Sequence, residues 1–490
     1  MKNAITFLFT CITLLCTAQT SVSKQITENN PPEKALAPLR FLASDELQGR
    51  GSTAPIINVA AKYIAESFRS YGLKEFNGFP DYVQSFDIRL HTSPDQGRFS
   101  IGGHEFRMGE SLLSHSGNDL KMKVPVVYAG YGTEKELEKI DVKGKVVITD
   151  FGVNENSGLM ESVQALMEQK SALMAKKGAL AIVERFQDKG LSWEMLRHAS
   201  AAEVVEKDPE GFRVLLVNDP EGKLKKISRN AEGELVIQNT RKRNFKAKNI
   251  LGYVEGTDPK LKKEYLLLSA HYDHTGVAPS AQMVQGRKDS IFNGARDNAA
   301  GVSAMMAAAR YFAKHPPKRS VLFVAYAAEE IGLVGSTHFV SKPPVPLSSI
   351  IFNLNNDSGG YNDTSAITVF GSGRTSADND IRQAAGTFGL RMLPEPSPEE
   401  NLFMRSDNFP LARVGIPAIT YTLGLTAFDA KAKEHYHQVT DEVGNMDLDY
   451  VLKYINTYIH AAKNIADNPA TPVWSKGEPF EAKWKELYGK

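Results

Sequence analysis

The stretch SVLFVAYAAEE, residues 320–330, determines the fold that we predict. Its first nine residues are almost continuously apolar, which indicates a strand buried on both faces of a largely parallel sheet. Similar runs recur along the chain: EYLLLSA (264–270), SSIIFNLNN (348–356), AITVFG (366–371) and IPAITYT (416–422). Helical patterns lie between or after them, at 298–315, 377–389 and 448–466. We therefore expect an α/β fold, in which helices sandwich a largely parallel or mixed sheet.

Two acidic residues, Glu329 and Glu330, follow the apolar run directly. Adjacent carboxylates at the end of a buried strand repel each other and are costly to desolvate. We therefore expect positive charge close to them. Alternatively, the strand ends there and both acids face water at the start of a helix, because the first turns of helices are enriched in acids. Taken alone, the pair favours this alternative.

The bulk composition bounds the class of protein. A chain of 490 residues is too long to fold around one ordinary hydrophobic core, so we expect two or three domains. With 42% hydrophobic residues, 23% charged residues and a net charge of +1, nothing indicates binding to nucleic acid or to an anionic membrane. The short basic runs lack the interleaved aromatic residues that bind single strands.

The N-terminal segment resembles an export signal. Residues 1–18 combine a positive start, an apolar stretch too short to be a good membrane span, and small residues that predict cleavage after Ala18. We expect export to the periplasm or the exterior, without stable membrane insertion. A lipid anchor through Cys16 is less favoured, because Leu15 precedes it. Both cysteines, Cys11 and Cys16, lie in this segment, so a metal site in the mature chain must use His, Asp and Glu.

Polar side chains follow the predicted strands where each one ends. They are His271 and Asp273, then Asp297 at the start of a helix, Glu329 and Glu330, Asp357, and finally His437 with Tyr436 before it and Asp441 after it. Because open α/β sheets place their sites beyond the carboxyl ends of the strands, we expect these groups to converge. Histidines and carboxylates together form the nitrogen and oxygen ligand set that zinc accepts.

Several motifs resemble those of metallopeptidase family twenty-eight, the two-zinc aminopeptidases. They are SAHYDHTG, NGARDNAAG, AYAAEEIGLVGS, NLNNDSGG, RSDNFPLARVGIPA and HYHQVTDE, and they span residues 246–465. The earlier FLASDELQGRG and AAKYIAESFRSYGL resemble the N-terminal segment of that family. Residues 120–245 resemble the protease-associated domain that some of its members carry as an insert.

The resemblance implies a ligand set for two Zn²⁺ ions per chain. His271 and Asp357 would hold one ion, Glu330 and His437 would hold the other, and Asp297 would bridge both. Such a pair of ions lowers the pKa of a bound water and clamps the oxygens of the reacting carbonyl.

The resemblance also implies roles for neighbouring side chains. Glu329 would be the general base that accepts a proton from the water. Asp273 would orient His271 through its second ring nitrogen. Tyr436 would stabilise the tetrahedral oxyanion.

The chain departs from its relatives at two places. Arg296 stands before Asp297 where many relatives have an acid, and it either pairs with a nearby carboxylate or points outward. Asn408 follows Asp407 where relatives often have histidine, which leaves the role of this position open. We expect His274 to neighbour the site rather than bind metal, because the ligand set is complete without it.

We predict a signal peptide at 1–18, a peptidase domain in two parts (31–119 and 246–470), a protease-associated insert at 120–245, and a C-terminal tail at 471–490. The function that we expect is a secreted zinc aminopeptidase acting on the N-termini of peptides or proteins. The alternatives are a glutaminyl-peptide cyclotransferase that uses one zinc, a carboxypeptidase of the same family, and a catalytically silent receptor-like protein. Complete ligand positions argue against the last.

Overall fold

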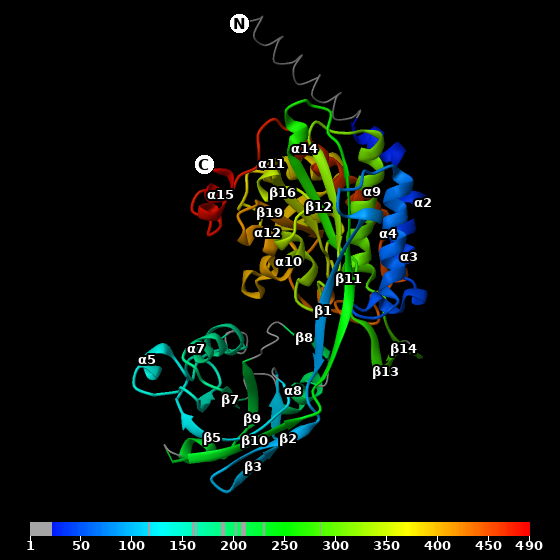
Figure 1. The fold of residues 1–490 in the computed structure, drawn as a ribbon. Helices are drawn as coiled ribbons and strands as arrows, with labels where there is room; N and C mark the ends of the chain where they lie inside the picture. The colour runs from blue at the N-terminus through cyan, green and yellow to red at the C-terminus, as the bar shows by residue number, and fades with distance from the viewer. Residues whose placement is uncertain are drawn as a thin grey trace, which may run out of the picture. The chain divides into compact units, whose positions relative to one another are not determined.

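The structure is a computed structural model that describes residues 22–115, 118–158, 162–163, 165–187, 192–200, 203–206, 212–228, 231–284 and 286–490. The chain forms two compact units, Met1–Phe86 with Lys246–Lys490, and Asp87–Phe245 (Figure 1). The expected signal peptide at 1–18 lies outside the described residues. Among the residues that are described, no helix has the length and apolar character needed to cross a membrane.

The first unit contains most of a mixed sheet with the strand order β18-β17-β19-β16-β12-β15-β11-β1, of which residues 87–92 of β1 and 241–245 of β11 belong to the second unit. Its strands are β1 (Val83–Thr92), β11 (Arg241–Val254), β12 (Tyr265–His271), β15 (Ser320–Tyr326), β16 (Ile350–Asn356), β17 (Ala366–Phe370), β18 (Arg391–Pro394) and β19 (Ala418–Leu423). Strands β15, β12, β16 and β19 are parallel neighbours. Their carboxyl ends therefore meet at one edge of the sheet.

Helices cover both faces of this sheet. Since side chains alternate across a strand, Phe323 of β15 packs towards Phe68 on one face, whereas Leu322 and Val324 join Phe339 and Leu411 in a cluster on the other. The first layer contains α2 (Pro32–Ala35), α3 (Ala37–Leu42), α4 (Ile57–Tyr71), α9 (Gly301–Lys314), α11 (Asp378–Thr387) and α14 (Leu448–Asp467). The second contains α10 (Val334–Ser341) and α12 (Asn408–Arg413).

The predicted α/β fold is confirmed. Every position of β15 and of β16 is buried, as their continuous apolar sequences predict for strands covered on both faces. The remaining elements of the unit are the hairpin β13 (Gly276–Val284) and β14 (Arg287–Phe292), α13 (Ala430–Lys433), and α15 (Glu481–Tyr488) in the expected tail.

One helix prediction was wrong. The pattern at residues 33–47 predicts a continuous amphipathic helix, but the structure has α2, α3 and a 3-10 helix at Asp45–Arg50. The break has a local cause, because Pro38 carries no N–H to donate to the carbonyl of Lys34. That carbonyl instead accepts a hydrogen bond from Nη1 of Arg310, at 2.8 Å.

The second unit contains a sheet with the strand order β3-β2-β10-β5-β6-β7-β9-β4. Its strands are β2 (Gln96–Ile101), β3 (His104–Arg107), β4 (Leu112–Ser114), β5 (Leu120–Tyr128), β6 (Val146–Asp150), β7 (Ala181–Phe186), β9 (Arg213–Asn218) and β10 (Ala231–Gln238). The short strand β8 (Glu203–Val205) pairs with the end of β1. The helices are α5 (Glu134–Leu137), a π-helical turn at Ala165–Lys170 that continues into α7 (Ser171–Lys176), and α8 (Trp193–Ser200).

The hairpin that the sequence predicts around Gly102 and Gly103 is present as β2 and β3. It belongs to the sheet of the second unit, because β2 pairs along its length with β10. The compact unit therefore begins at Asp87, not at the residue 120 that the sequence suggested. Its identity as a protease-associated domain stays a prediction.

Candidate metal centre

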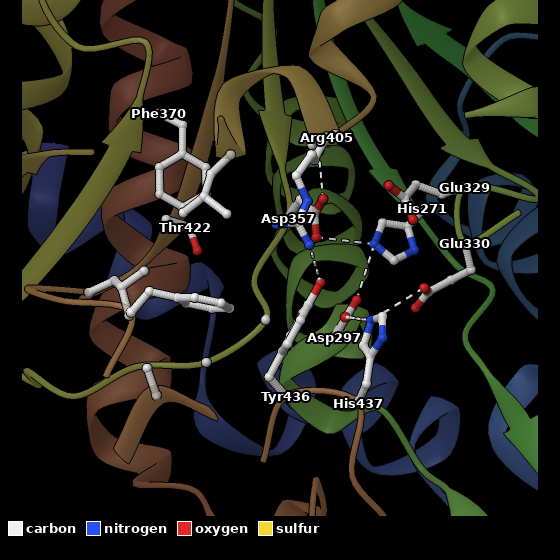
Figure 2. Close-up of a pocket in the computed structure, with 17 residues that line it drawn as sticks. His271, Asp297, Glu329, Glu330, Asp357, Phe370, Arg405, Thr422, Tyr436 and His437 are labelled. Carbon is white, nitrogen blue, oxygen red and sulfur yellow. Dashed lines mark hydrogen bonds and ion pairs between the residues drawn. The ribbon is translucent and has the colours of Figure 1, made fainter. Parts of the chain in front are cut away.

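The polar residues predicted at the strand ends converge at the carboxyl edge of the first unit's sheet (Figure 2). His271 is the last residue of β12, Asp357 directly follows β16, and Glu330 lies four residues after the end of β15. The parallel register places these ends side by side, with His271 opposite Tyr326. Strand order and strand length thus bring together side chains that lie far apart in the sequence.

Two small clusters share one carboxylate. In the first, Nε2 of His271 lies 3.1 Å from Oδ1 of Asp357 and 3.3 Å from Oδ1 of Asp297. In the second, Nε2 of His437 lies 3.1 Å from Oδ2 of Asp297 and 3.3 Å from Oε2 of Glu330. Asp297 therefore presents one oxygen to each cluster, between two imidazole rings.

These spacings fit a tetrahedral zinc site. Ligand bonds of about 2.0–2.1 Å place neighbouring ligand atoms of such a site about 3.3 Å apart. The separations of 3.1–3.3 Å between nitrogen and oxygen atoms match that value in both clusters. In addition, Oδ1 of Asp297 is buried without a hydrogen-bond partner, as expected for an atom that binds a cation. The donor types and their geometry both suit zinc.

Asp441 holds the backbone around Asp297 in place. Its carboxylate accepts hydrogen bonds from the N–H groups of Arg296, at 3.0 Å to either oxygen, and of Asp297, at 3.1 Å. The side chain of Arg296 turns inward, where Nη1 donates to Oδ1 of Asp441 at 2.9 Å. Of the two expectations for Arg296, the structure shows the paired one, with the residue only 3% exposed.

Asp273 contacts the site differently from the expectation. Its carboxylate accepts hydrogen bonds from the hydroxyl of Ser52 and from the backbone N–H groups of Glu329 and Glu330. Nδ1 of His271 lies 3.2 Å from the backbone oxygen of Asp273 but 3.9 Å from its nearest carboxylate oxygen. Asp273 thus orients His271 through the main chain, because its side chain is occupied by the next strand end.

The segment 405–408 combines two residues that line the cavity, Arg405 and Ser406, with the two named from the sequence, Asp407 and Asn408. Ser406 donates a hydrogen bond to Oδ2 of Asp357 at 2.5 Å. Asp407 is fully buried and belongs to neither cluster, and burial raises its pKa to about 7. Asn408 is also buried, and its side-chain oxygen accepts a hydrogen bond from Thr420 at 2.8 Å. Asn408 therefore forms a hydrogen bond within the buried interior of the fold.

The density of carboxylates changes the ionisation of the site. Burial raises the pKa of Glu329 well above its usual value, and the charges of Asp357 and Glu330 raise it further. Burial also lowers the pKa of His437, but its hydrogen bond to Asp297 and the charge of Glu330 outweigh this effect and raise the pKa to about 9. The shift of the His437 pKa is the response to an excess of negative charge, whereas that of Glu329 comes first from burial and only then from its charged neighbours.

Tyr436 reaches into the site beside His437. The two rings are stacked, with centroids 4.1 Å apart, and Nη2 of Arg405 donates to Oη of Tyr436 at 3.2 Å (Figure 2). The backbone at Gly359 passes so close that an added Cβ atom would lie 2.5 Å from the tyrosine ring. A glycine is therefore required at this position.

A cavity of about 80 Å³ opens beside the clusters. One side carries the predicted polar residues together with Arg405. The other side is mainly apolar and is formed by Phe370, Leu402, Leu425, Phe428 and Ala432. The apolar lining was not predicted from the sequence, because it draws on loops that carry no shared motif.

Sequence reasoning also missed Arg50. Its buried guanidinium donates to the backbone oxygens of Tyr272 at 3.0 Å, Asn293 at 2.6 Å and Gly294 at 3.0 Å, and also to that of Leu42. Burial lowers the pKa of Arg50 to about 10, against the opposing effect of the nearby carboxylates. This arginine ties together the loops that carry His271 and Asp297. A role of this kind leaves no pattern in the sequence.

Fold and site together define an α/β protein with a candidate histidine–carboxylate metal site at the carboxyl edge of its sheet. Residues 249–462 match peptidase family M28, and this part of the chain belongs to that family. The resemblance read from the motifs is thereby confirmed.

Similar proteins share short stretches of sequence with this chain. Aminopeptidase YwaD of Bacillus subtilis is 32% identical over 114 residues, which is 23% of this chain and 22% of that protein. A vacuolar membrane protease of Saccharomyces cerevisiae is 31% identical over 116 residues, which is 24% of this chain and 10% of that protein. The matched stretches thus cover less than a quarter of each relative.

Solved structures share the fold over most of the chain. An aminopeptidase from Aneurinibacillus sp. strain AM-1 has a TM-score of 0.59 at 20% identity, covering 93% of this chain and 98% of that one. A zinc aminopeptidase from Bacillus subtilis has a TM-score of 0.51 at 20% identity, covering 92% and 97%.

Proposed function

We propose that this protein is a two-zinc aminopeptidase that removes the N-terminal residue from peptides or proteins. The observation that carries the proposal is Asp297, whose two carboxylate oxygens each face a separate histidine–carboxylate pair. His271 and Asp357 would hold one ion, and Glu330 and His437 the other. When bound, two such ions supply Lewis acidity and a water of lowered pKa.

Glu329 is the general base in this proposal. It lines the cavity but contributes no atom to either cluster, so its carboxylate stays available for proton transfer. Its backbone is fixed by Asp273, and burial raises the affinity of its carboxylate for a proton. Glu329 therefore accepts the proton of the attacking water and delivers it to the leaving amine.

Tyr436 is the oxyanion donor. Because Arg405 donates to the phenolic oxygen, that oxygen already has one acceptor position filled, and its own proton is free to point into the cavity. A hydroxyl aimed at the developing negative charge stabilises the tetrahedral state more than the ground state.

The cavity also accounts for exopeptidase action. The carboxylates of Glu329 and Asp357 provide an anionic anchor for a free α-amine. The apolar side, with Phe370 and Leu425, lies in the same cavity. A substrate whose amine binds the carboxylates would place its first side chain against this apolar surface. We therefore propose a preference for N-terminal residues with apolar side chains.

The relatives support this proposal, since one is named an aminopeptidase and a structural neighbour is titled a zinc aminopeptidase. The alternatives are less favoured. A cyclotransferase with one zinc leaves the second cluster unexplained. A carboxypeptidase for acidic dipeptides needs several arginines to bind the carboxylates of its substrate. Among the described residues that line the cavity, Arg405 is the single arginine. Export, through residues 1–18, is part of the proposal.

A panel of fluorogenic aminoacyl amides tests the activity. We expect hydrolysis of leucyl and methionyl substrates, no hydrolysis of glutamyl or N-acetylleucyl ones, loss of activity on chelation and recovery with zinc. Ammonia release from a peptide with N-terminal glutamine would instead support the cyclotransferase. Equal cleavage of leucyl and N-acetylleucyl substrates would contradict an aminopeptidase.

A further inference from the structure

We infer that His274 is a positioning residue that fixes the carboxylate of Glu330 in the orientation needed to bind metal. This inference rests on the proposed two-zinc site. The side chain of His274 is fully buried, and its Nδ1 atom lies 2.6 Å from Oε1 of Glu330. The other carboxylate oxygen, Oε2, is the one that faces His437.

His274 belongs to the second cluster by position, since one of its ring nitrogens lies within 4.8 Å of ligand atoms of Asp297, Glu330 and His437. Its distance from Glu330 nevertheless separates it from the ligands. Two ligands of one tetrahedral zinc ion lie about 3.3 Å apart. The histidine–carboxylate pairs of both clusters have this spacing, at 3.1–3.3 Å. At 2.6 Å, Nδ1 of His274 and Oε1 of Glu330 are instead at the distance of a strong hydrogen bond to a carboxylate. Nδ1 of His274 is also 3.9 Å from Oδ1 of Asp297, too far for a hydrogen bond to that residue.

The proton of this hydrogen bond belongs to His274. An ionised carboxylate only accepts, so Nδ1 must carry the hydrogen. A protonated ring nitrogen has no lone pair to offer a metal ion, which leaves Nε2 as the other potential ligand atom of the ring. Nε2 of His274 is buried and has no hydrogen-bond partner among the described residues. The contact of the ring with Glu330 is made through Nδ1.

The ring has little freedom to move. The backbone N–H of His274 donates to the carbonyl of Arg50 at 3.1 Å, which holds the main chain at this point. Gly294 lies against the ring, since a Cβ atom there would be 2.6 Å from Cδ2 of His274. The ring of His437 also packs against the ring of His274 in an edge-on arrangement, with centroids 5.4 Å apart.

Glu330 is thus held at both ends. Asp273 accepts a hydrogen bond from its backbone N–H, and His274 donates one to its side chain. A carboxylate with one oxygen fixed in this way keeps the other oxygen directed at the second cluster. Removal of such a supporting partner typically weakens metal binding by about 10–100-fold.

Two substitutions of His274 separate this role from alternatives. The side-chain nitrogen of asparagine can occupy the place of Nδ1, whereas that of glutamine reaches the place of Nε2. We expect H274N to keep both zinc ions with affinities close to those of the wild type. H274Q should bind one ion normally and the other about 10–100-fold more weakly.

The measurement is zinc affinity by competition with a chromogenic chelator, with total zinc per chain determined by elemental analysis. Wild-type affinities in H274Q would overturn the inference. Equal weakening in H274N and H274Q would also overturn it, because a hydrogen-bond donor at Nδ1 would then not be the feature that matters. Fewer than two zinc ions in the wild type would overturn the proposed function itself.

A spectroscopic measurement on the wild-type protein tests the inference without requiring that a variant folds. In zinc-free protein carrying ¹⁵N-labelled histidine, the signal of His274 should show its proton on Nδ1. Assignment of that signal can use the histidine that disappears from the spectrum of H274N. A proton found on Nε2 instead would overturn the inference.

Discussion

The backbone N–H of Glu329 donates to Oδ1 of Asp273 at 3.1 Å. The neighbouring N–H of Glu330 donates to Oδ2 of the same carboxylate at 3.3 Å. Asp273 follows β12 and the two glutamates follow β15, so one buried acid links adjacent strand ends. This link explains how two consecutive glutamates can serve different purposes. One side chain is directed to the second cluster, and the other stays free beside it.

Replacing the base tests the assignment of Glu329. We expect E329Q to lower kcat by about 10²–10⁴-fold, because the amide cannot accept the proton of the attacking water. Zinc content should stay at the wild-type value, since Glu329 belongs to neither cluster. Steady-state kinetics with elemental analysis of the same preparation measures both. A variant with a wild-type rate would remove Glu329 from the mechanism.

Replacing Asp273 by asparagine tests the link between the strand ends. The amide NH₂ group would face one of the N–H donors, leaving buried polar groups unsatisfied at about 1–3 kcal/mol of unfolding free energy. We expect D273N to lower stability in urea and to lower kcat more than it changes KM, because Glu329 loses its fixed position. D449N, at an exposed acid in the first turn of α14, is the matched control; it should leave kcat and KM unchanged and lower stability by no more than about 1 kcal/mol, through the helix dipole.

The apolar side of the cavity should determine the preferred N-terminal residue. Phe370 is part of that lining. We expect F370A to lower kcat/KM for leucyl substrates by about 10-fold or more, in line with the 1–3 kcal/mol that apolar pocket contacts contribute to discrimination. Larger aromatic substrates should lose less, since the pocket is widened. An unchanged ratio of leucyl to phenylalanyl rates would show that the first side chain binds elsewhere.

The environment of Glu184 in the second unit should make the unfolding free energy depend on pH. Glu184 is fully buried in β7, and Nζ of Lys170 lies 2.6 Å from its Oε1. Burial raises the pKa of Glu184 from 4.5 to about 7, although the charge of Lys170 opposes this. At pH values between 4.5 and about 7, the Glu184 carboxyl group has lost its proton in the unfolded chain but keeps it in the folded chain. The unfolding free energy therefore falls as pH rises through this window, by up to about 3 kcal/mol.

Urea unfolding of the wild type and of E184Q between pH 4.5 and 7 measures this effect. Glutamine does not titrate. The unfolding free energy of the wild type should therefore fall relative to that of E184Q as the pH rises across the window. Parallel stability profiles would show that Glu184 titrates at its ordinary pKa.

The parts of the site that could be predicted from the sequence are those with a local signature. Continuous apolar runs predicted β12, β15 and β16, and the residues that follow such strands lie together in any parallel sheet. His271, Glu330 and Asp357 were found in this way, and their positions depend on strand direction, strand order and strand ends. Asp297 was found from its place at the start of the helical pattern that became α9.

Other features depend on contacts between distant segments and have no local signature. Arg50 binds backbone carbonyls, which every sequence provides, so no motif marks its partners. The start of the second unit at Asp87 depends on pairing between β2 and β10, more than a hundred residues apart in the chain. The break in the first helix was predictable from Pro38, but the amphipathic pattern around it concealed the effect.

The central claim is that Asp297 bridges two zinc ions. Anomalous diffraction at the zinc absorption edge, from crystals of the zinc-loaded protein, tests it most directly. The proposal predicts two peaks about 3.5–4 Å apart, one beside each carboxylate oxygen of Asp297. A single peak, or peaks remote from Asp297, would contradict it.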